Sequence, residues 1–144
     1  MRRTLILTAL ALTVLIASNV SAVAQRQWYR GNVKEIIRKL EADTDRFKSS
    51  LDSGLDRSNL NGSKREDEIN EYVRRFEEAT DRLRDRAEDE QYAPNLAREV
   101  LQRGKAINGF MRTYRLGGDA ESDWVRVRND LTWLANSYHV KWRW

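Results

Sequence analysis

Side chains that commonly carry out chemistry are scarce in this chain. Its 144 residues include no cysteine and one histidine, His139. Without cysteine there are no disulfides, thiolate zinc sites, iron–sulfur clusters, thiol nucleophiles or c-type haem attachments. A single histidine also excludes two-histidine metal motifs and the di-iron sites of helical bundles, which take a Glu-x-x-His from each of two helices. Most familiar enzyme classes are therefore ruled out.

Three weaker chemical possibilities depend on where side chains would lie. His139 and Met111 are residue types that hold haem b in bundles, but they fall near opposite ends of an antiparallel bundle and are not expected to share an iron. The 22 acidic residues allow a catalytic carboxylate pair, although their spacing selects none. The stretch from Asp56 to Glu68 resembles a calcium-binding EF-hand loop, but Arg57 stands where the first carboxylate must be.

An irregular calcium site remains open as an alternative, against a simple polar connection with turn residues and a helix cap. Its ligands would be Asp52, Asp56 and Asp67. On balance the sequence predicts no catalytic residues, no metal site and no cofactor, and we expect the protein not to be an enzyme.

Residues 1–24 have the layout of a secretory signal peptide. Arg2 and Arg3 are followed by an apolar run from Leu5 to Ile16, and Ala22-Val23-Ala24 fits cleavage before Gln25. The alternative is an uncleaved membrane anchor, but an apolar run of 12 residues is short for a bilayer core of about 30 Å. Cleavage would leave 24 basic and 22 acidic residues, so the formal net charge falls from +4 to +2.

These features predict a soluble protein, secreted or periplasmic, that does not bind nucleic acid. Both signs of charge are interspersed along the predicted helices and form no basic stripe.

The remaining residues, 25–144, are expected to form one all-α domain. Apolar residues recur with helical spacing in four windows, near 32–51, 63–90, 94–116 and 119–139. Asn32 with Glu35 and Ser63 with Glu66 are predicted capping boxes, and Pro94 suits a first helical turn. In the last window the apolar spacing of 3, 4, 3, 4 is typical of a packed seam: Trp124, Val127, Leu131, Leu134 and Tyr138.

The connections between these windows are short, apart from an irregular stretch predicted from Asp52 to Gly62. Short connections make consecutive helices antiparallel neighbours. The predicted fold is therefore an up-down-up-down antiparallel four-helix bundle.

Several short motifs resemble a group of small secreted bacterial helical proteins of unknown function. The motifs are Leu55-Asp56-Arg57-Ser58, Leu60-Asn61-Gly62, Glu66-Asp67, Ile69-Asn70, Phe76-Glu77, Ala79-Thr80-Asp81-Arg82-Leu83, Leu131, Leu134-Ala135, Tyr138 and Trp142-Arg143-Trp144. The resemblance covers most of the mature chain. It implies export and a helical domain, and it implies no activity.

Three polar residues interrupt the apolar stripes near the helix centres. Thr44, Thr80 and Arg103 are expected on core faces, with Glu41 or Glu77 as counter-charge at the stripe edge. Such a layer can fix helix register, or Arg103 can extend past Gly104 to solvent. The functional alternative is a buried guanidinium that binds a small anionic ligand or cofactor.

Aromatic residues form the other unusual feature. In an antiparallel bundle Trp28 and Tyr29 would lie close to Trp142 and Trp144, which predicts an aromatic cap at one end. The alternative is a C-terminal tail, with Arg143 between the rings, that contacts a membrane surface or a cell-wall polymer.

Trp133 lies apart from these residues, on the helix face that carries Arg126. An exposed tryptophan there would be a partner-binding anchor. The candidate interaction surface is Arg126, Trp133, Trp142, Arg143 and Trp144.

The leading functional hypothesis is a non-enzymatic, extracytoplasmic bundle that binds a protein or the cell envelope, with homo-oligomers and peripheral membrane contact as further options. A small-ligand binder built around Arg103 is the alternative, and an enzyme of unidentified class comes third.

Overall fold

Four helices and no strands make up the part of the chain that the computed structural model describes. The description covers the backbone of residues 7–144 and side chains from Asn32 onward. The helices are α1 (Leu7–Asp56), α2 (Lys64–Glu88), α3 (Pro94–Thr113) and α4 (Gly118–Ser137). The all-α prediction is confirmed, while the side chains of the predicted signal peptide, residues 1–24, lie outside the described residues.

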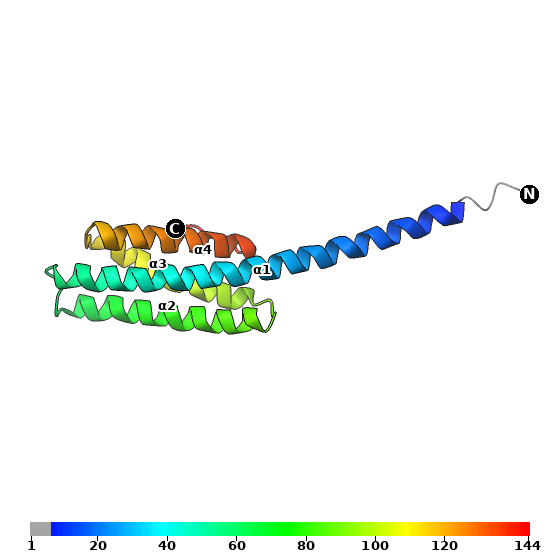
Figure 1. Cartoon of the computed structure of the whole chain (residues 1–144). Helices are drawn as coiled ribbons and strands as arrows, with labels where there is room; N and C mark the ends of the chain where they lie inside the picture. Colours follow the sequence, from blue (N-terminus) through cyan, green and yellow to red (C-terminus); the bar gives the residue numbers. More distant parts are fainter. Residues whose placement is uncertain (1–6) are drawn as a thin grey trace, which may run out of the picture.

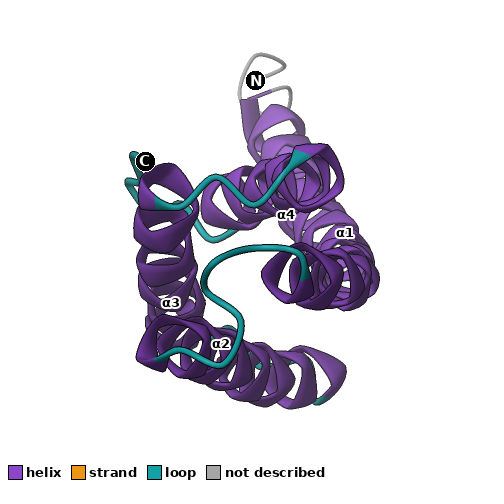
Figure 2. Ribbon diagram, turned by 90° about the vertical axis from the view of Figure 1, so that its left-hand side faces the viewer, coloured by secondary structure: helices purple, strands orange, loops and turns teal. Residues whose placement is uncertain are grey.

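The helices pack in pairs around one apolar core. α1 lies beside α4 and α2 beside α3, and the pairs are joined mainly through α1 and α2 (Figures 1 and 2). The first part of α1 extends beyond the other three helices in Figure 1. The largest fully buried side chains come from all four helices: Phe47, Phe76, Ile37, Leu40, Leu51, Leu55, Ile69, Leu83, Leu101, Ile107, Leu131 and Leu134.

The first helix differs from its prediction at both ends. It runs through Asn32 and Glu35, so the capping box predicted there is wrong. It also continues to Asp56, because Leu55 prolongs the buried stripe of Leu51 by one turn. Gly54 permits this extension, since a Cβ there would lie 3.0 Å from the carbonyl oxygen of Leu116. The predicted irregular stretch thus shrinks to residues 57–63.

The predicted starts of α2 and α3 are confirmed. Ser63 caps α2 by accepting hydrogen bonds from the backbone N–H groups of Arg65 and Glu66. The Glu66 carboxylate reaches back to the N–H of Gly62, one residue before the cap. Pro94 lies in the first turn of α3, where its missing N–H costs nothing. α3 ends at Thr113, three residues before the predicted end.

The buried seam predicted for the fourth window is confirmed in α4, where all five of its residues are buried. α4 ends two residues earlier than predicted, at Ser137. His139 follows in the left-handed conformation, with φ of 52°. The N–H of Val140 then donates to the Ala135 carbonyl at 2.8 Å and the N–H of His139 to the Asn136 carbonyl at 3.1 Å. These bonds define a Schellman motif that reverses the chain.

Candidate functional site

The two buried threonines of the predicted polar layer satisfy their hydroxyls within their own helices. The Thr44 hydroxyl donates to the Leu40 carbonyl at 2.7 Å, and the Thr80 hydroxyl donates to the Phe76 carbonyl at 3.0 Å. Both side chains are almost fully buried. Back-bonding of this kind leaves neither hydroxyl free to donate to a ligand.

The two glutamates of the layer pair with cations between α1 and α2. Glu41 accepts from Arg84 at 2.7 Å, and Glu77 accepts from Lys48 at 2.8 Å. Burial raises the pKa of Glu41, although the Arg84 charge opposes that shift. An open groove between the two helices is lined by these glutamates and both threonines, with Arg74 and Arg84 as its arginines. The structure therefore brings four of the five predicted layer residues together.

Arg103 is not part of this layer. Of the two alternatives for this residue, extension past Gly104 to solvent is confirmed, and the buried guanidinium is wrong. Its side chain is 41% exposed and pairs with Glu99 at 3.5 Å, while Glu99 also binds Arg82 at 2.8 Å. The next residue faces the core instead: a Cβ on Gly104 would lie 2.6 Å from a methyl group of Leu131. Arg103 therefore reaches solvent past the contact of Gly104 with Leu131.

A pair of buried carboxyl groups between α1 and α4 escaped the sequence analysis. Asp43 and Asp130 are each 5% exposed. Lys39 bridges them, with Nζ at 2.6 Å from Asp43 and 2.8 Å from Asp130, and Arg46 lies 3.4 Å from Asp43. Asp43 and Asp130 interrupt apolar stripes at core positions, which is the signal that could have identified them.

The pKa values of the two carboxyl groups are shifted in opposite directions. Burial raises the pKa of Asp130, whereas hydrogen bonds from Lys39 and Asp130 outweigh burial and lower the pKa of Asp43. Asp130 is therefore the more readily protonated carboxyl group of the pair. The buried Oδ2 atom of Asp130 has no hydrogen-bond partner. The cluster joins α1 to α4, and its two cations, Lys39 and Arg46, have exposed side chains.

The C-terminal tryptophans do not close the end of the bundle as predicted. After His139 the tail folds back along α4, and the C-terminus lies beside the middle of that helix in Figure 1. The Trp144 ring packs edge-on against Trp124, with centroids 6.4 Å apart, and beneath the Arg128 guanidinium at 4.9 Å. The Trp144 indole also donates to the Thr132 hydroxyl at 3.3 Å.

Trp142 belongs to the same packed tail. Its ring lies edge-on to Trp144, with centroids 5.4 Å apart, and under Lys105 of α3 at 5.8 Å. Both rings are half-buried, so the tail is a packed part of the bundle. Near the end of the bundle, Tyr92 stacks on Tyr138 at 5.6 Å. The side chains of Trp28 and Tyr29, the other half of the predicted cap, lie outside the described residues.

The remaining members of the predicted interaction surface stay exposed. Trp133 is 63% exposed, and Arg126 and Arg143 are also exposed. Trp133 and Arg126 belong to one solvent-facing strip, here called the α4 outer face. It consists of Ser122, Val125, Arg126, Asn129, Thr132, Trp133 and Asn136.

The α4 outer face has an unusual composition for this chain. Charged residues make up 33% of the sequence, yet Arg126 is the only charged member of this strip. Val125, at 49% exposed, and Trp133 are two of the three most exposed large hydrophobic side chains among residues 32–144. Depletion of charge together with an aromatic anchor is the composition of a protein–protein interface core.

Residues 32–144 include the side chains that the calcium and haem hypotheses invoked. No group of three or more acidic or histidine side chains there is placed to hold a metal ion. No helix in the described part of the chain is long and apolar enough to cross a membrane. Met111 is buried in the core, whereas His139 is exposed at the turn after α4.

Comparison with known proteins identified no relative: no protein family, no curated protein and no solved structure matches this chain.

Proposed function

We propose that this chain is a secreted or periplasmic protein without enzymatic activity, which acts by binding another protein through the α4 outer face. The observation that carries the proposal is the exposed, charge-poor strip around Trp133. A tryptophan on the surface of a packed helix offers a large apolar area at little cost in conformational entropy. The packed tail supports α4 along one edge of the strip, where Trp144 contacts Trp124 and Thr132, so the strip would meet a partner already ordered.

The proposal includes an up-down-up-down arrangement of the four helices. It is supported by the order of the contacts between consecutive helices. As the residue number rises along one helix, the number of its contact residue on the next helix falls, so the two helices are antiparallel. Glu41 pairs with Arg84 and Lys48 with Glu77 across α1 and α2. Across α3 and α4, Gly104 faces Leu131 and Asn108 accepts a hydrogen bond from Trp124.

Export by the first 24 residues is the second part of the proposal. It rests on the basic start, the apolar run and the A-x-A site before Gln25. The test is to express the full chain in a bacterium, fractionate the cells and measure the intact mass of the product. A mass that begins at Gln25, in the periplasm or the medium, supports export. A full-length product in the cytoplasm contradicts it.

Partner binding is tested by placing a photo-crosslinking amino acid at Trp133 in the exported protein. The matched control carries the same group at Asn70, an exposed and uncharged position on α2. We expect covalent adducts with protein from position 133 and none from position 70. Adducts of equal yield from both positions, or none from either, contradict the proposal. Adducts only with lipid or cell-wall polymer would contradict a protein partner and would identify the cell envelope as the surface that the α4 outer face contacts.

A further inference from the structure

The α4 outer face has the spacing of a second seam, on the opposite side of α4 from the buried one. Ser122, Val125, Asn129, Thr132 and Asn136 follow one another at intervals of 3, 4, 3 and 4 residues, and Trp133 adjoins them. This spacing keeps side chains in line when two helices pack along each other. We infer that the α4 outer face binds the same face of a second copy of this chain, antiparallel, with Asn129 at the crossing point. This inference rests on the proposed function and names the partner.

The first argument is that the strip is complementary to itself. Asn129 lies at its centre, and Val125 and Trp133 lie four residues to either side, about 6 Å along the helix. A two-fold axis through Asn129 therefore sets Trp133 of one copy opposite Val125 of the other, twice. It also sets Arg126 opposite Thr132, so no pair of like charges meets within the strip. An isologous interface of this kind closes as a dimer.

The residue at the crossing point fits such an interface. On a two-fold axis each Asn129 side chain meets its own counterpart, and an amide can both donate to and accept from another amide. A single asparagine in a helical seam is a known determinant of register and oligomeric state. Ser122 and Asn136, at the two ends of the strip, would meet each other across the interface.

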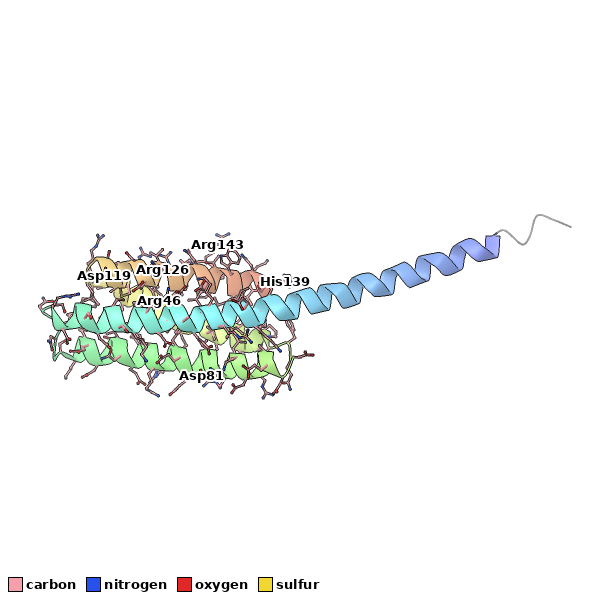
Figure 3. All side chains as sticks on the ribbon, viewed as in Figure 1. Arg46, Asp81, Asp119, Arg126, His139 and Arg143 are labelled. Atoms are coloured by element: carbon pink, nitrogen blue, oxygen red, sulfur yellow. The ribbon has the colours of Figure 1, made fainter. Side chains whose placement is uncertain are left out.

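The second argument is charge complementarity along α4. The first turn of the helix is acidic, with Asp119 and Glu121. The other half carries the exposed cations of the tail, Lys141 and Arg143. Figure 3 shows Asp119 at one end of α4, His139 at the other, and Arg143 on the side of Arg126 nearer to His139. An antiparallel pair brings acidic start and basic tail together, whereas a parallel pair sets like charges side by side.

The size of the strip sets the strength of the expected association. It is one helix wide, smaller than the interface of an obligate dimer, and only Val125 and Trp133 contribute large apolar surfaces. We therefore expect the dissociation constant of the dimer to lie in the micromolar range, and the dissociated monomer to remain folded.

Disulfide trapping tests the crossing point directly, because the natural chain has no cysteine. The protein is expressed from the full chain, and Asn129→Cys is compared with Asn70→Cys under mild oxidation. Two cysteines on a two-fold axis can reach the separation that a disulfide needs. We expect a covalent dimer from Asn129→Cys and at most a small fraction from Asn70→Cys. Equal cross-linking of the two variants overturns the inference.

A charge swap at the same position tests the symmetry. Asn129→Glu and Asn129→Lys each place like charges against each other on the axis, so each alone should weaken dimerisation by roughly tenfold or more. An equimolar mixture should recover the dimer, because opposite charges then meet. Sedimentation velocity over a concentration series measures each case, and circular dichroism shows that the variants are folded. A natural chain that stays monomeric at high concentration, or a mixture no tighter than either variant, overturns the inference.

These outcomes separate the inference from the proposed function. Photo-crosslinks from position 133 to a different protein, together with failure of the cysteine and charge-swap tests, overturn the second copy as partner and leave the proposed function intact. Crosslinks to the same chain together with recovery in the mixture support both. Absence of crosslinks and of dimers overturns both.

Discussion

The outer faces of α2 and α4 differ in composition, although the inner faces of the two helices are built alike. Each helix buries an apolar stripe, which includes Phe76 and Leu83 in α2 and Leu131 and Leu134 in α4. Every exposed residue of α2 except Asn70 is charged. On the α4 outer face every residue except Arg126 is uncharged. The buried apolar stripes account for the folding of both helices. They do not explain why the outer face of α2 is charged and the α4 outer face is not.

The charges on α2 are paired along the helix. Arg74 binds Glu71 and Glu78, and Arg75 binds Glu71 at 2.6 Å. The two arginines lower the pKa of Glu71 to about 2. Pairs of this kind at intervals of three and four residues support an exposed helix and keep it soluble. On the α4 outer face Arg126 pairs with Asp123 at 3.8 Å, and the other members of the strip are uncharged. The strip therefore depends more on the core and the tail for its order, which is the arrangement expected of a surface kept free for a partner.

The largest effect is expected from removing the tail that supports α4. Deleting residues 140–144 takes away Trp142 and Trp144, whose rings cover Trp124 and bridge to Lys105 and Arg128. Loss of two half-buried indoles should cost about 3 kcal/mol of unfolding free energy. Urea denaturation followed by far-ultraviolet circular dichroism measures the change. An unchanged free energy of unfolding after deletion of residues 140–144 would mean that the tail does not support α4.

The next effect comes from the contact that joins α3 to α4. Gly104→Ala should cost about 2 kcal/mol, because the new methyl group overlaps Leu131. Gly109 provides the matched control in the same helix, since a Cβ there meets nothing within 4 Å. Gly109→Ala should stabilise the protein by about 0.5–1 kcal/mol through helix propensity alone. Thermal unfolding of both variants gives the comparison, and the same sign for both would contradict this geometry.

The carboxyl pair between α1 and α4 predicts two opposite pH dependences. The pKa of Asp43 is lowered on folding, so its contribution to stability is present above its unfolded pKa and is lost as the pH falls. The pKa of Asp130 is raised, so its contribution is present at low pH and is lost as the pH rises through the folded value. Asp43→Asn should therefore cost more stability at pH 7 than at pH 3.

Asp130→Asn should show the reverse, costing more at pH 3 than at pH 7, or even stabilising the protein at pH 7. Urea titrations of both variants at the two pH values measure this difference. If both variants lost more stability at pH 7 than at pH 3, the pKa of Asp130 would not be raised on folding.

A smaller effect is expected at the turn that ends α4. His139 adopts a left-handed conformation, with φ of 52°, which histidine tolerates better than most residues but glycine adopts without strain. His139→Gly should stabilise the protein by about 0.5 kcal/mol, the strain relief exceeding the added entropy of the unfolded chain. His139→Ala keeps the strain and is the control, expected to be neutral or destabilising. Equal gains from the two variants would contradict this explanation.

How much of this structure was predictable from the sequence depended on whether the signal was local. The cap at Ser63, the start at Pro94 and the buried seam of α4 follow from spacing within one helix, and all are confirmed. The exposure of Trp133 follows from the same spacing. Export and partner binding remain predictions.

The errors arose where contacts between elements decide the outcome. Helical spacing predicted Arg103 on the core face of α3, but the neighbouring Gly104 makes the contact with Leu131. Periodicity alone does not distinguish two adjacent positions at the centre of a helix face. The fold-back of the tail depends on the turn at His139, on the α4 side chains that contact Trp144, and on Lys105 of α3, which lies over Trp142. Asp130 was overlooked because its partner Asp43 is 87 residues away in the sequence.

The smallest effect on stability, and the one that bears most directly on the two outer faces, is expected from Trp133. Trp133→Ala removes a side chain that is 63% exposed, so the unfolding free energy should change by less than about 0.5 kcal/mol. Arg75→Ala on α2 is the matched control, with a side chain 51% exposed and a change of similar size expected. The two variants should nevertheless differ in association. Trp133→Ala should abolish concentration-dependent dimerisation, and Arg75→Ala should leave it unchanged, as measured by sedimentation velocity. A large stability loss in Trp133→Ala would make this tryptophan part of the fold, and the contrast between the two faces would then lose its functional meaning.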